Sequence, residues 1–518
     1  MAGKESTRLS RISFPQLDSE PRIRAAVFHY RKRKSHRDHA LGEATLYPSC
    51  SLSRRGRLAS VGPIAGGTIA LAAACALAAS AVLAAPLEPV AVFVLAPPGP
   101  MPPHGELAKR IDSASGLVVA GERLNAGLLR RFYAAHGFEP VWSTRQAQAN
   151  SLLNAVLRAG DHGIAPELFH ANLLRNTATL QPLDRELLLS DAFLSYADAL
   201  AHGAMPVARR TDDEALTPEP IDVAAALETA IGRPDPAAAI EALAPTTPTY
   251  RLLRQALQSY RSATPEGDKA ATNRLRQIEV NLERQRWLPR RLPAERVWVN
   301  AADARLVLYR ADRSVFSTRV IIGQDGKPNQ TPEFRVTIDG ILFNPPWNIP
   351  ESIVTEEILP KISHDPNYLR QHNLVMKPDG GLQQLPGPGA ALGQIKFEME
   401  NRFDVYLHDT PSKNLFSRDN RRISHGCIRV QNPRELAALL MQQPIDAIGQ
   451  AIAMGSTTRS NLPAPVAAFV VYQTAFADID GTLQFRPDVY SRDAAIWPYL
   501  HPVRQPVAER EPPGQIRG

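Results

Sequence analysis

Cys427 and two histidines near it in the sequence provide the groups needed for nucleophilic catalysis. Cys427 directly follows Ser424, His425 and Gly426, and 15 residues separate His408 from Ser424. A cysteine attacks as its thiolate, so it needs a base or a positive charge nearby. Either histidine can serve as that base. The sequence therefore predicts a site with a nucleophilic cysteine.

Residues next to this motif have types that suit substrate binding. Gly426 lets the backbone turn sharply or approach a substrate closely. Arg429 lies two residues after Cys427, so on a strand it shares the cysteine's face and can grip a carboxylate with two hydrogen bonds. Tyr406 alternates with His408 and shares its face. We expect Arg429 and Tyr406 to contact the substrate.

Trp347 is a further candidate for the substrate site. It lies among prolines in the segment 344–350, which is typical of a loop. We expect it to form a wall of the site, and packing in the core is the alternative.

A zinc site made of His408, His425 and Cys427 is another interpretation of the motif. The paired ligand spacings of protein zinc sites, such as CxxC or HxxxH, are absent around these residues. We therefore expect neither a metal ion nor a cofactor.

Charge is distributed unevenly along the 518 residues. The net charge is +7, but residues 1–60 contain 13 lysines and arginines against 5 aspartates and glutamates, a net charge of +8. The rest of the chain is thus close to neutral, at −1. A protein that binds nucleic acid carries its positive charge on the folded part. The charge pattern argues against a nucleic-acid partner.

Residues 64–85 are an uncharged, alanine-rich run that follows basic residues. A membrane-spanning helix needs ~20 apolar residues, and preceding basic residues favour a cytoplasmic N-terminus. Within 61–96 we expect either a cleaved signal peptide or one helix anchored in the inner membrane. The protein is then exported to the periplasm. Residues 1–60 are either a basic cytoplasmic leader or sequence read from a start codon placed too early.

Cys427 is the only cysteine of the part that we expect to be exported, since the others are Cys50 and Cys75. A lone cysteine in an oxidising compartment has no disulfide partner, so a reactive role explains it better than stapling. A small buried thiol is the alternative.

Two kinds of hydrophobic pattern follow a proline-rich linker at 97–104. Residues 105–280 show helical periodicity, with predicted helices at 124–137, 151–163, 186–203, 223–231 and 250–260. From about residue 295 the pattern alternates with period two, which predicts strands within 296–323, 334–341, 394–398 and 404–407, followed by a helix at 433–441. We expect an α+β multidomain chain: a helical domain, a mainly β domain over 281–455, and a C-terminal β extension over 456–518.

The motif resembles the signature of the L,D-transpeptidases, the YkuD family: a histidine, a fixed gap, then Ser-His-Gly-Cys and an arginine two residues later. Further segments are similar to the larger YcbB-like members, namely NLERQRWLP (281–289) and NPPWNIPESI (344–353). FYAAHGFEPVW (132–142) is similar to their α-helical scaffold domain. Roughly residues 120–490 fit the resemblance.

The resemblance implies acyl transfer between peptidoglycan peptide stems. Cys427 would attack the carbonyl between the L-centre of meso-diaminopimelate and the terminal D-Ala of a tetrapeptide stem, release D-Ala and form a thioester. The amine of a second stem's diaminopimelate would then attack, giving a 3→3 cross-link. His408 matches the family's catalytic histidine. His425, Gly426 and the Cys427 amide would line the oxyanion hole, with Ser424 as support.

The resemblance also predicts a lid and one missing domain. The polar segment 351–381 corresponds to a capping loop that would restrict water at the site. Many larger members insert a peptidoglycan-binding domain after the scaffold, and residues 262–277 are too short to hold one. Two other functions remain open: an L,D-carboxypeptidase or lipoprotein-attaching transferase using the same thioester, and a non-catalytic wall-binding scaffold protein.

Overall fold

The structure is a computed structural model in which a defined part of the chain is described. The described residues are 93–95, 105–112, 116–210, 216–263, 265 and 267–502. The predicted leader (1–60), apolar run (64–85) and linker (97–104) lie outside them, so those predictions stay predictions. Among the described helices, none is long and apolar enough to span a membrane.

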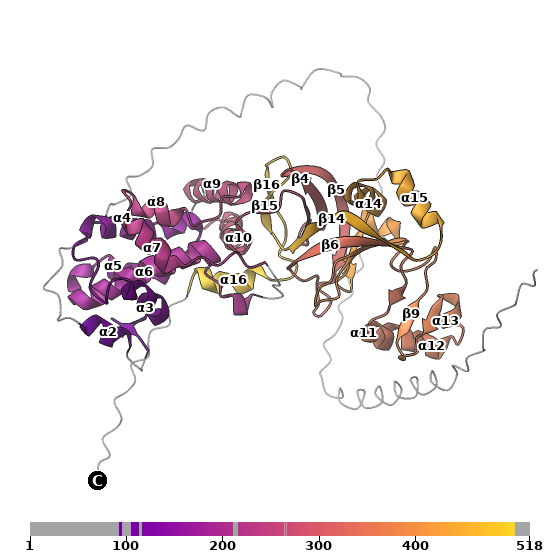
Figure 1. The fold of residues 1–518 in the computed structure, drawn as a ribbon, viewed down its shortest axis with the longest axis horizontal. Helices are drawn as coiled ribbons and strands as arrows, with labels where there is room; N and C mark the ends of the chain where they lie inside the picture. The colour runs from indigo at the N-terminus through magenta and orange to yellow at the C-terminus, as the bar shows by residue number, and fades with distance from the viewer. Residues whose placement is uncertain are drawn as a thin grey trace, which may run out of the picture. The chain divides into compact units, whose positions relative to one another are not determined.

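The N-terminal domain is a helical bundle, as the sequence predicts (Figure 1). Its α-helices are α2 (Glu106–Ile111), α3 (Ala126–Ala134), α4 (Gln146–Leu157), α5 (Ala171–Leu174), α6 (Pro182–His202), α7 (Val223–Ile231), α8 (Pro236–Glu241), α9 (Pro248–Ala263) and α10 (Lys269–Arg286). The 3₁₀-helices η1 (Ala159–His162), η2 (Pro166–Phe169), η3 (Thr177–Thr179) and η4 (Val207–Arg209) and the hairpin β1 (Val118–Val119) and β2 (Glu122–Arg123) complete it.

The helix starts follow from local chemistry. The side chains of Asn125, Asp222, Asp235 and Asp268 each accept a hydrogen bond from a backbone N–H in the first turn of the next helix. Such caps satisfy donors that have no partner inside the helix. Helix α6 is buried along most of its length, which is why its apolar residues lie on several faces.

Helix α10 crosses the domain boundary expected at 280/281. It continues to Arg286, and the charged side chains of its last turns are buried. Glu283 and Arg286 are both fully buried and form an ion pair of 2.8 Å. The sequence pattern is hard to interpret here because these charges lie on a core-facing surface.

The second domain is built on one sheet. Its strands are β3 (Arg296–Asn300), β4 (Arg305–Arg310), β5 (Arg313–Gly323), β6 (Phe334–Phe343), β10 (Ile395–Glu398), β11 (Leu407–His408), β12 (Arg422–Ser424), β13 (Ile428–Val430) and β14 (Thr458–Val471). Among the described residues these nine strands have the order β12-β5-β13-β11-β10-β6-β14-β3-β4, and β4 also pairs with β5. The sheet therefore closes on itself, which removes most free edges.

Strand β14 changes the predicted organisation of the C-terminal part. It lies between β6 and β3, antiparallel to the first and parallel to the second. The segment after 455 is thus not only an extension, because its first strand is central to the sheet. Pairing partners this distant in sequence leave no trace in local periodicity.

Apolar side chains fill the inside of the closed sheet, and helices α14 (Pro433–Met441) and α15 (Ile445–Ala453) add to this core. The fully buried members include Val297, Leu306, Ile338, Phe343, Phe397, Leu407, Ile428, Leu436 and Val470. The strands of the site are consequently held by burial on the sheet's inner face.

The predicted capping loop is mostly helical. It contains α11 (Glu351–Ile353), the π-helix η5 (Val354–Ile358), α12 (Leu359–His364) and α13 (Tyr368–Gln371). Strands β7 (Trp347–Asn348), β9 (Leu382–Gln384) and β8 (Leu374–Met376) form a three-stranded sheet in that order. Residues 349–369 and 376–382 belong to a compact unit of their own.

The end of the described chain packs against the helical domain. After β14 come β15 (Ala475–Ala477), β16 (Leu483–Phe485) and α16 (Asp493–Leu500). Helix α10 contacts both β15 and α16. Arg284 of α10 forms a buried ion pair of 2.6 Å with Asp493.

His162 in the helical domain makes stability depend on pH. Its Nδ1 lies 2.8 Å from the Tyr250 hydroxyl. Burial, and then the charges of Arg254 and Arg286, lower the pKa of His162 from 6.5 to about 2. The neutral ring therefore stabilises the fold fully above pH 6.5, and this contribution is lost as pH falls toward 2.

We predict that the unfolding temperature falls between pH 6.5 and ~4, and that His162→Asn makes this fall shallower. Thermal unfolding followed across this range by circular dichroism measures the slope. Replacement of the exposed His364 by Asn is the matched control, which should keep the wild-type slope. An identical slope for His162→Asn would contradict the assignment.

Candidate active site

Two paired strands bring the predicted residues together. β11 and β13 are parallel, with Leu407 opposite Ile428 and His408 opposite Arg429. The N–H of Ile428 donates to the carbonyl of Tyr406, which is one of the hydrogen bonds of this pairing. Tyr406 and His408 alternate with Leu407, whose side chain is buried, and their ring centroids are 5.7 Å apart. The site thus lies on the sheet face opposite the apolar core.

The turn before β13 is fixed by Ser424 and Gly426. The Ser424 hydroxyl donates to the Cys427 carbonyl over 2.6 Å and accepts from the Gly426 N–H over 3.2 Å. Gly426 has φ 111°, a conformation that L side chains rarely adopt. The conformation of the turn therefore explains why the motif has a serine at 424 and a glycine at 426.

Cys427 is half-buried directly before β13, with its thiol 3.6 Å from the Asp404 carbonyl. Burial raises the pKa of the Cys427 thiol. Hydrogen bonds from the backbone and hydroxyl of Tyr406, then the charges of Lys396 and Arg429, act in the opposite direction. Burial dominates, so the resting cysteine is a neutral thiol.

His408 is also neutral. It is 4% exposed, and its Nδ1 lies within hydrogen-bond distance of the Asp409 carbonyl. Burial, and then the charge of Arg429, lower the pKa of His408 to about 3, while the backbone carbonyls of Asp409 and Leu392 oppose the shift. The Asp409 carbonyl therefore fixes the orientation of the His408 ring.

The Asp409 carboxylate is committed elsewhere. It pairs with Lys413 at 2.6 Å and accepts from the Gln394 N–H at 2.9 Å. A Cβ at Gly393 would lie 2.4 Å from this carboxylate, so the turn at 393 is built around it. The Asp409 side chain thus fixes the backbone at the end of β11 against the turn at 393.

Positive charge surrounds the cysteine. Arg429 is half-buried, and burial lowers its pKa. Its buried Nε has no hydrogen-bond partner in the described part of the chain. Lys396, opposite His408 on β10, places its Nζ 4.1 Å from the centre of the Tyr406 ring. Both cations suit an anionic group near the thiol.

Trp347 and His425 complete the set of predicted residues. Trp347 lies on β7, and its side chain is hydrogen-bonded to Tyr406, which brings the tryptophan to the site. Burial, followed by the charge of Cys427, raises the pKa of Tyr406. His425 is exposed in the turn before the cysteine. Its part in an oxyanion hole stays a prediction.

Sequence reasoning missed Lys396, Asp404 and Thr331. Lys396 lies between the buried residues Ile395 and Phe397, so its side chain is on the opposite face of this short strand. A lysine at such a position was a sequence signal that could have identified it as a site residue. The Asp404 carbonyl contacts the Cys427 thiol, and the Thr331 hydroxyl donates to the Gly426 carbonyl. Both contacts join segments that are distant in sequence, so local pattern gave no signal for either residue.

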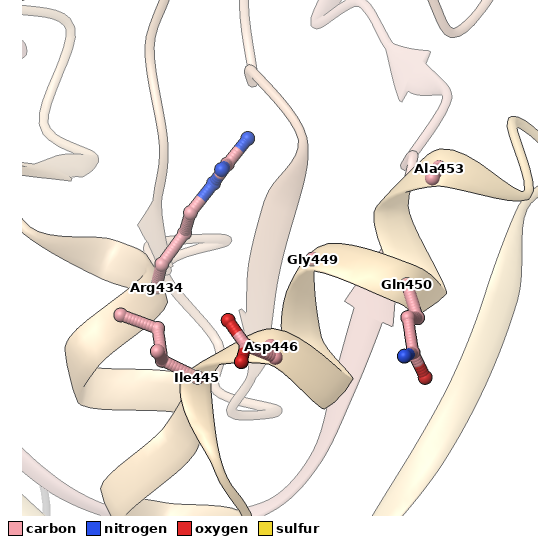
Figure 2. Close-up of a pocket in the computed structure, with 6 residues that line it drawn as sticks. All are labelled: Arg434, Ile445, Asp446, Gly449, Gln450 and Ala453. Carbon is pink, nitrogen blue, oxygen red and sulfur yellow. The ribbon is translucent and has the colours of Figure 1, made fainter.

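A metal site is not present among the described residues, where no group of three or more histidine, cysteine, aspartate or glutamate side chains could hold an ion. A separate open hollow of about 650 Å³ lies along α15 (Figure 2). It is lined by Arg434, Ile445, Asp446, Gly449, Gln450 and Ala453. None of the predicted site residues is among them, so we do not assign the chemistry to this hollow.

We predict that alkylation of Cys427 by iodoacetamide is slow at neutral pH and still accelerates above pH 9.0, the ordinary thiol pKa, because burial raises the pKa of this thiol. Mass spectrometry of the Cys427 peptide at a series of pH values gives the rates. A plateau reached below pH 7 would show a stabilised thiolate and contradict the neutral resting state.

Comparison with known proteins agrees with this arrangement. The Scaffold domain family matches residues 127–257, and the L,D-transpeptidase catalytic domain family, YkuD, matches residues 294–458. A curated Haemophilus influenzae protein named "Putative L,D-transpeptidase" is 28% identical over 399 residues, which cover 71% of this chain and 78% of that protein.

Two solved structures show weaker similarity. The Ldtfm–avibactam carbamoyl enzyme (TM-score 0.19) and a mutant of the Enterococcus faecium L,D-transpeptidase (TM-score 0.18) are each 10% identical and cover 35% of this chain. The chain spans about half the length of these two proteins, 49% and 50%. On the family matches alone, the chain carries a Scaffold domain followed by the catalytic domain of the YkuD family of L,D-transpeptidases.

Proposed function

We propose that the protein is an L,D-transpeptidase that forms 3→3 cross-links between peptidoglycan stems. The observation that carries the proposal is the register of β11 and β13, in which His408 pairs with Arg429, two residues after Cys427. The match of 294–458 to the catalytic domain family supports the same reaction class.

In the first step His408 acts as general base. Its low pKa leaves the ring unprotonated at neutral pH, so it can take the thiol proton as the sulfur attacks. The carbonyl attacked joins the L-centre of diaminopimelate to the terminal D-Ala. The C–N bond then breaks, the leaving D-Ala amine takes the proton from His408, and a thioester on Cys427 remains.

In the second step the diaminopimelate amine of an acceptor stem attacks the thioester. His408 accepts a proton from this amine and returns it to the thiolate as the C–S bond breaks. No cofactor or metal ion takes part. Water in place of the amine gives an L,D-carboxypeptidase, and a protein amine gives lipoprotein attachment.

Substrate binding is assigned to the groups around the thiol. The guanidinium of Arg429 binds a stem carboxylate, and Tyr406 and Trp347 form a wall beside it. The Cys427 amide, with His425 and Gly426, lines the oxyanion hole, and Ser424 supports the turn. Donor and acceptor stems are the partners. If residues 64–85 are not cleaved, they also anchor the protein in the inner membrane. The working compartment is the periplasm.

We predict that incubation with a tetrapeptide donor adds to the Cys427 peptide the mass of the donor minus D-Ala, and that an acceptor stem then yields 3→3 dimers. Cys427→Ala should lose both signals, whereas Cys50→Ala and Cys75→Ala should keep them. Peptide mapping and muropeptide analysis measure the two steps. Cross-linking by Cys427→Ala would contradict the proposal, and tripeptide without dimer would replace transfer by hydrolysis.

The helical segment 351–381 is proposed as a lid that favours the amine over water. Asn348 and Gln383 are opposite each other in the β7–β9 pair, and the N–H of the next residue, Ile349, donates to the carbonyl of Leu382, so the segment 350–381 can be replaced by a two-residue turn.

We predict that replacing 350–381 by Asn-Gly raises the ratio of hydrolysis to transfer several-fold, because water then reaches the thioester more easily. Products of one reaction mixture, separated by liquid chromatography, give the ratio. The intact chain under the same conditions is the control, and an unchanged ratio would exclude the lid.

A further inference from the structure

Thr331 links the turn that carries Cys427 to the neighbouring strand end. Its side chain is fully buried. Its hydroxyl donates to the Gly426 carbonyl over 2.8 Å and accepts from the Gly323 N–H over 2.9 Å. One hydroxyl thus uses both its donor and an acceptor site on the backbone of two segments.

The contact with Gly426 sets the direction of the next N–H. The Gly426 carbonyl and the Cys427 N–H belong to one planar trans peptide unit and point to opposite sides. Holding the carbonyl on Thr331 therefore aims this N–H away from Thr331. Among the backbone–backbone hydrogen bonds that the described residues form outside helices and strands, none is donated by the Cys427 N–H, which leaves it available to a substrate oxygen.

Thr331 is itself held by the C-terminal part of the chain. The Tyr490 hydroxyl donates to the Gly323 carbonyl over 2.7 Å and lies 3.4 Å from the Thr331 N–H. Arg492 donates to the Thr331 carbonyl over 2.9 Å and forms an ion pair of 3.1 Å with Glu333. All of these residues are buried, so each contact is shielded from water.

Buried contacts continue from there to helix α10 of the helical domain. Asp493, next to Arg492, pairs with Arg284 and accepts from the Thr474 hydroxyl over 2.8 Å. Asn281 of α10 donates to the same Thr474 hydroxyl over 2.7 Å. The buried contacts that support the Cys427 turn therefore extend from the closed sheet to helix α10 of the helical domain.

We propose that Thr331 is a positioning residue that orients the Gly426–Cys427 peptide for acyl transfer, and that Tyr490 and Arg492 keep Thr331 in place. The developing negative charge of the tetrahedral intermediate is stabilised by the Cys427 N–H, whose direction Thr331 determines. This assignment rests on the transpeptidase function proposed above. It predicts an effect on the chemical step and little effect on donor binding.

The test compares Thr331→Val with Thr331→Ser in steady-state transpeptidation. Valine keeps the shape and removes the hydroxyl, so kcat should fall about tenfold or more while KM changes less than about twofold. Serine restores the hydroxyl and should recover most of kcat. Tyr490→Phe should lower kcat less, because it removes only the support of Thr331.

Thr318→Val is the matched control. Thr318 lies on β5 and is buried like Thr331, but its hydroxyl contacts Asn432 at 3.5 Å and not the Cys427 turn. Its kcat should equal the wild-type value. Wild-type kcat in Thr331→Val, or equally low kcat in the valine and serine variants, would overturn the positioning role. Absence of Cys427 acylation in the wild-type protein would instead overturn the proposed function.

Discussion

The parallel pairing of β11 with β13 is the constraint on which the site depends. It places Tyr406 and His408 beside Cys427 and Arg429, although a long polar segment separates the two strands in sequence. The register is fixed from the other face, where Leu407 and Ile428 are fully buried in the closed sheet. A slip of one residue would move these apolar side chains out and the reactive ones in. Packing in the core thus fixes the relative positions of the site residues.

Burial around the thiol also sets its charge state. The pKa of His408 is lowered to about 3 and the pKa of Cys427 is raised, so both groups rest in their neutral forms. Neutral partners cost little to bury, whereas a thiolate–imidazolium pair would need further polar contacts. In the proposed mechanism the negative charge appears only during attack, where Arg429, Lys396 and the Cys427 amide would stabilise it.

Periodicity was sufficient to predict most elements, because strands such as β10 and helices such as α7 bury one regular face. It failed for the helices within 351–371, which are polar, and for the central place of β14, which depends on distant partners. Cys427 and Arg429 could be predicted because they belong to one short motif, and His408 because it precedes that motif by a fixed gap. Thr331 could not, since its contact with Gly426 exists only after 95 residues of chain have folded back.

A crystal structure of the protein trapped with a donor stem tests the central claim most directly. The account predicts continuous density from the Cys427 sulfur to the acyl carbon, with the acyl oxygen about 3 Å from the Cys427 N–H and the Gly426 carbonyl still bonded to Thr331. An acyl group attached to another residue, or an acyl oxygen turned away from this N–H, would contradict it.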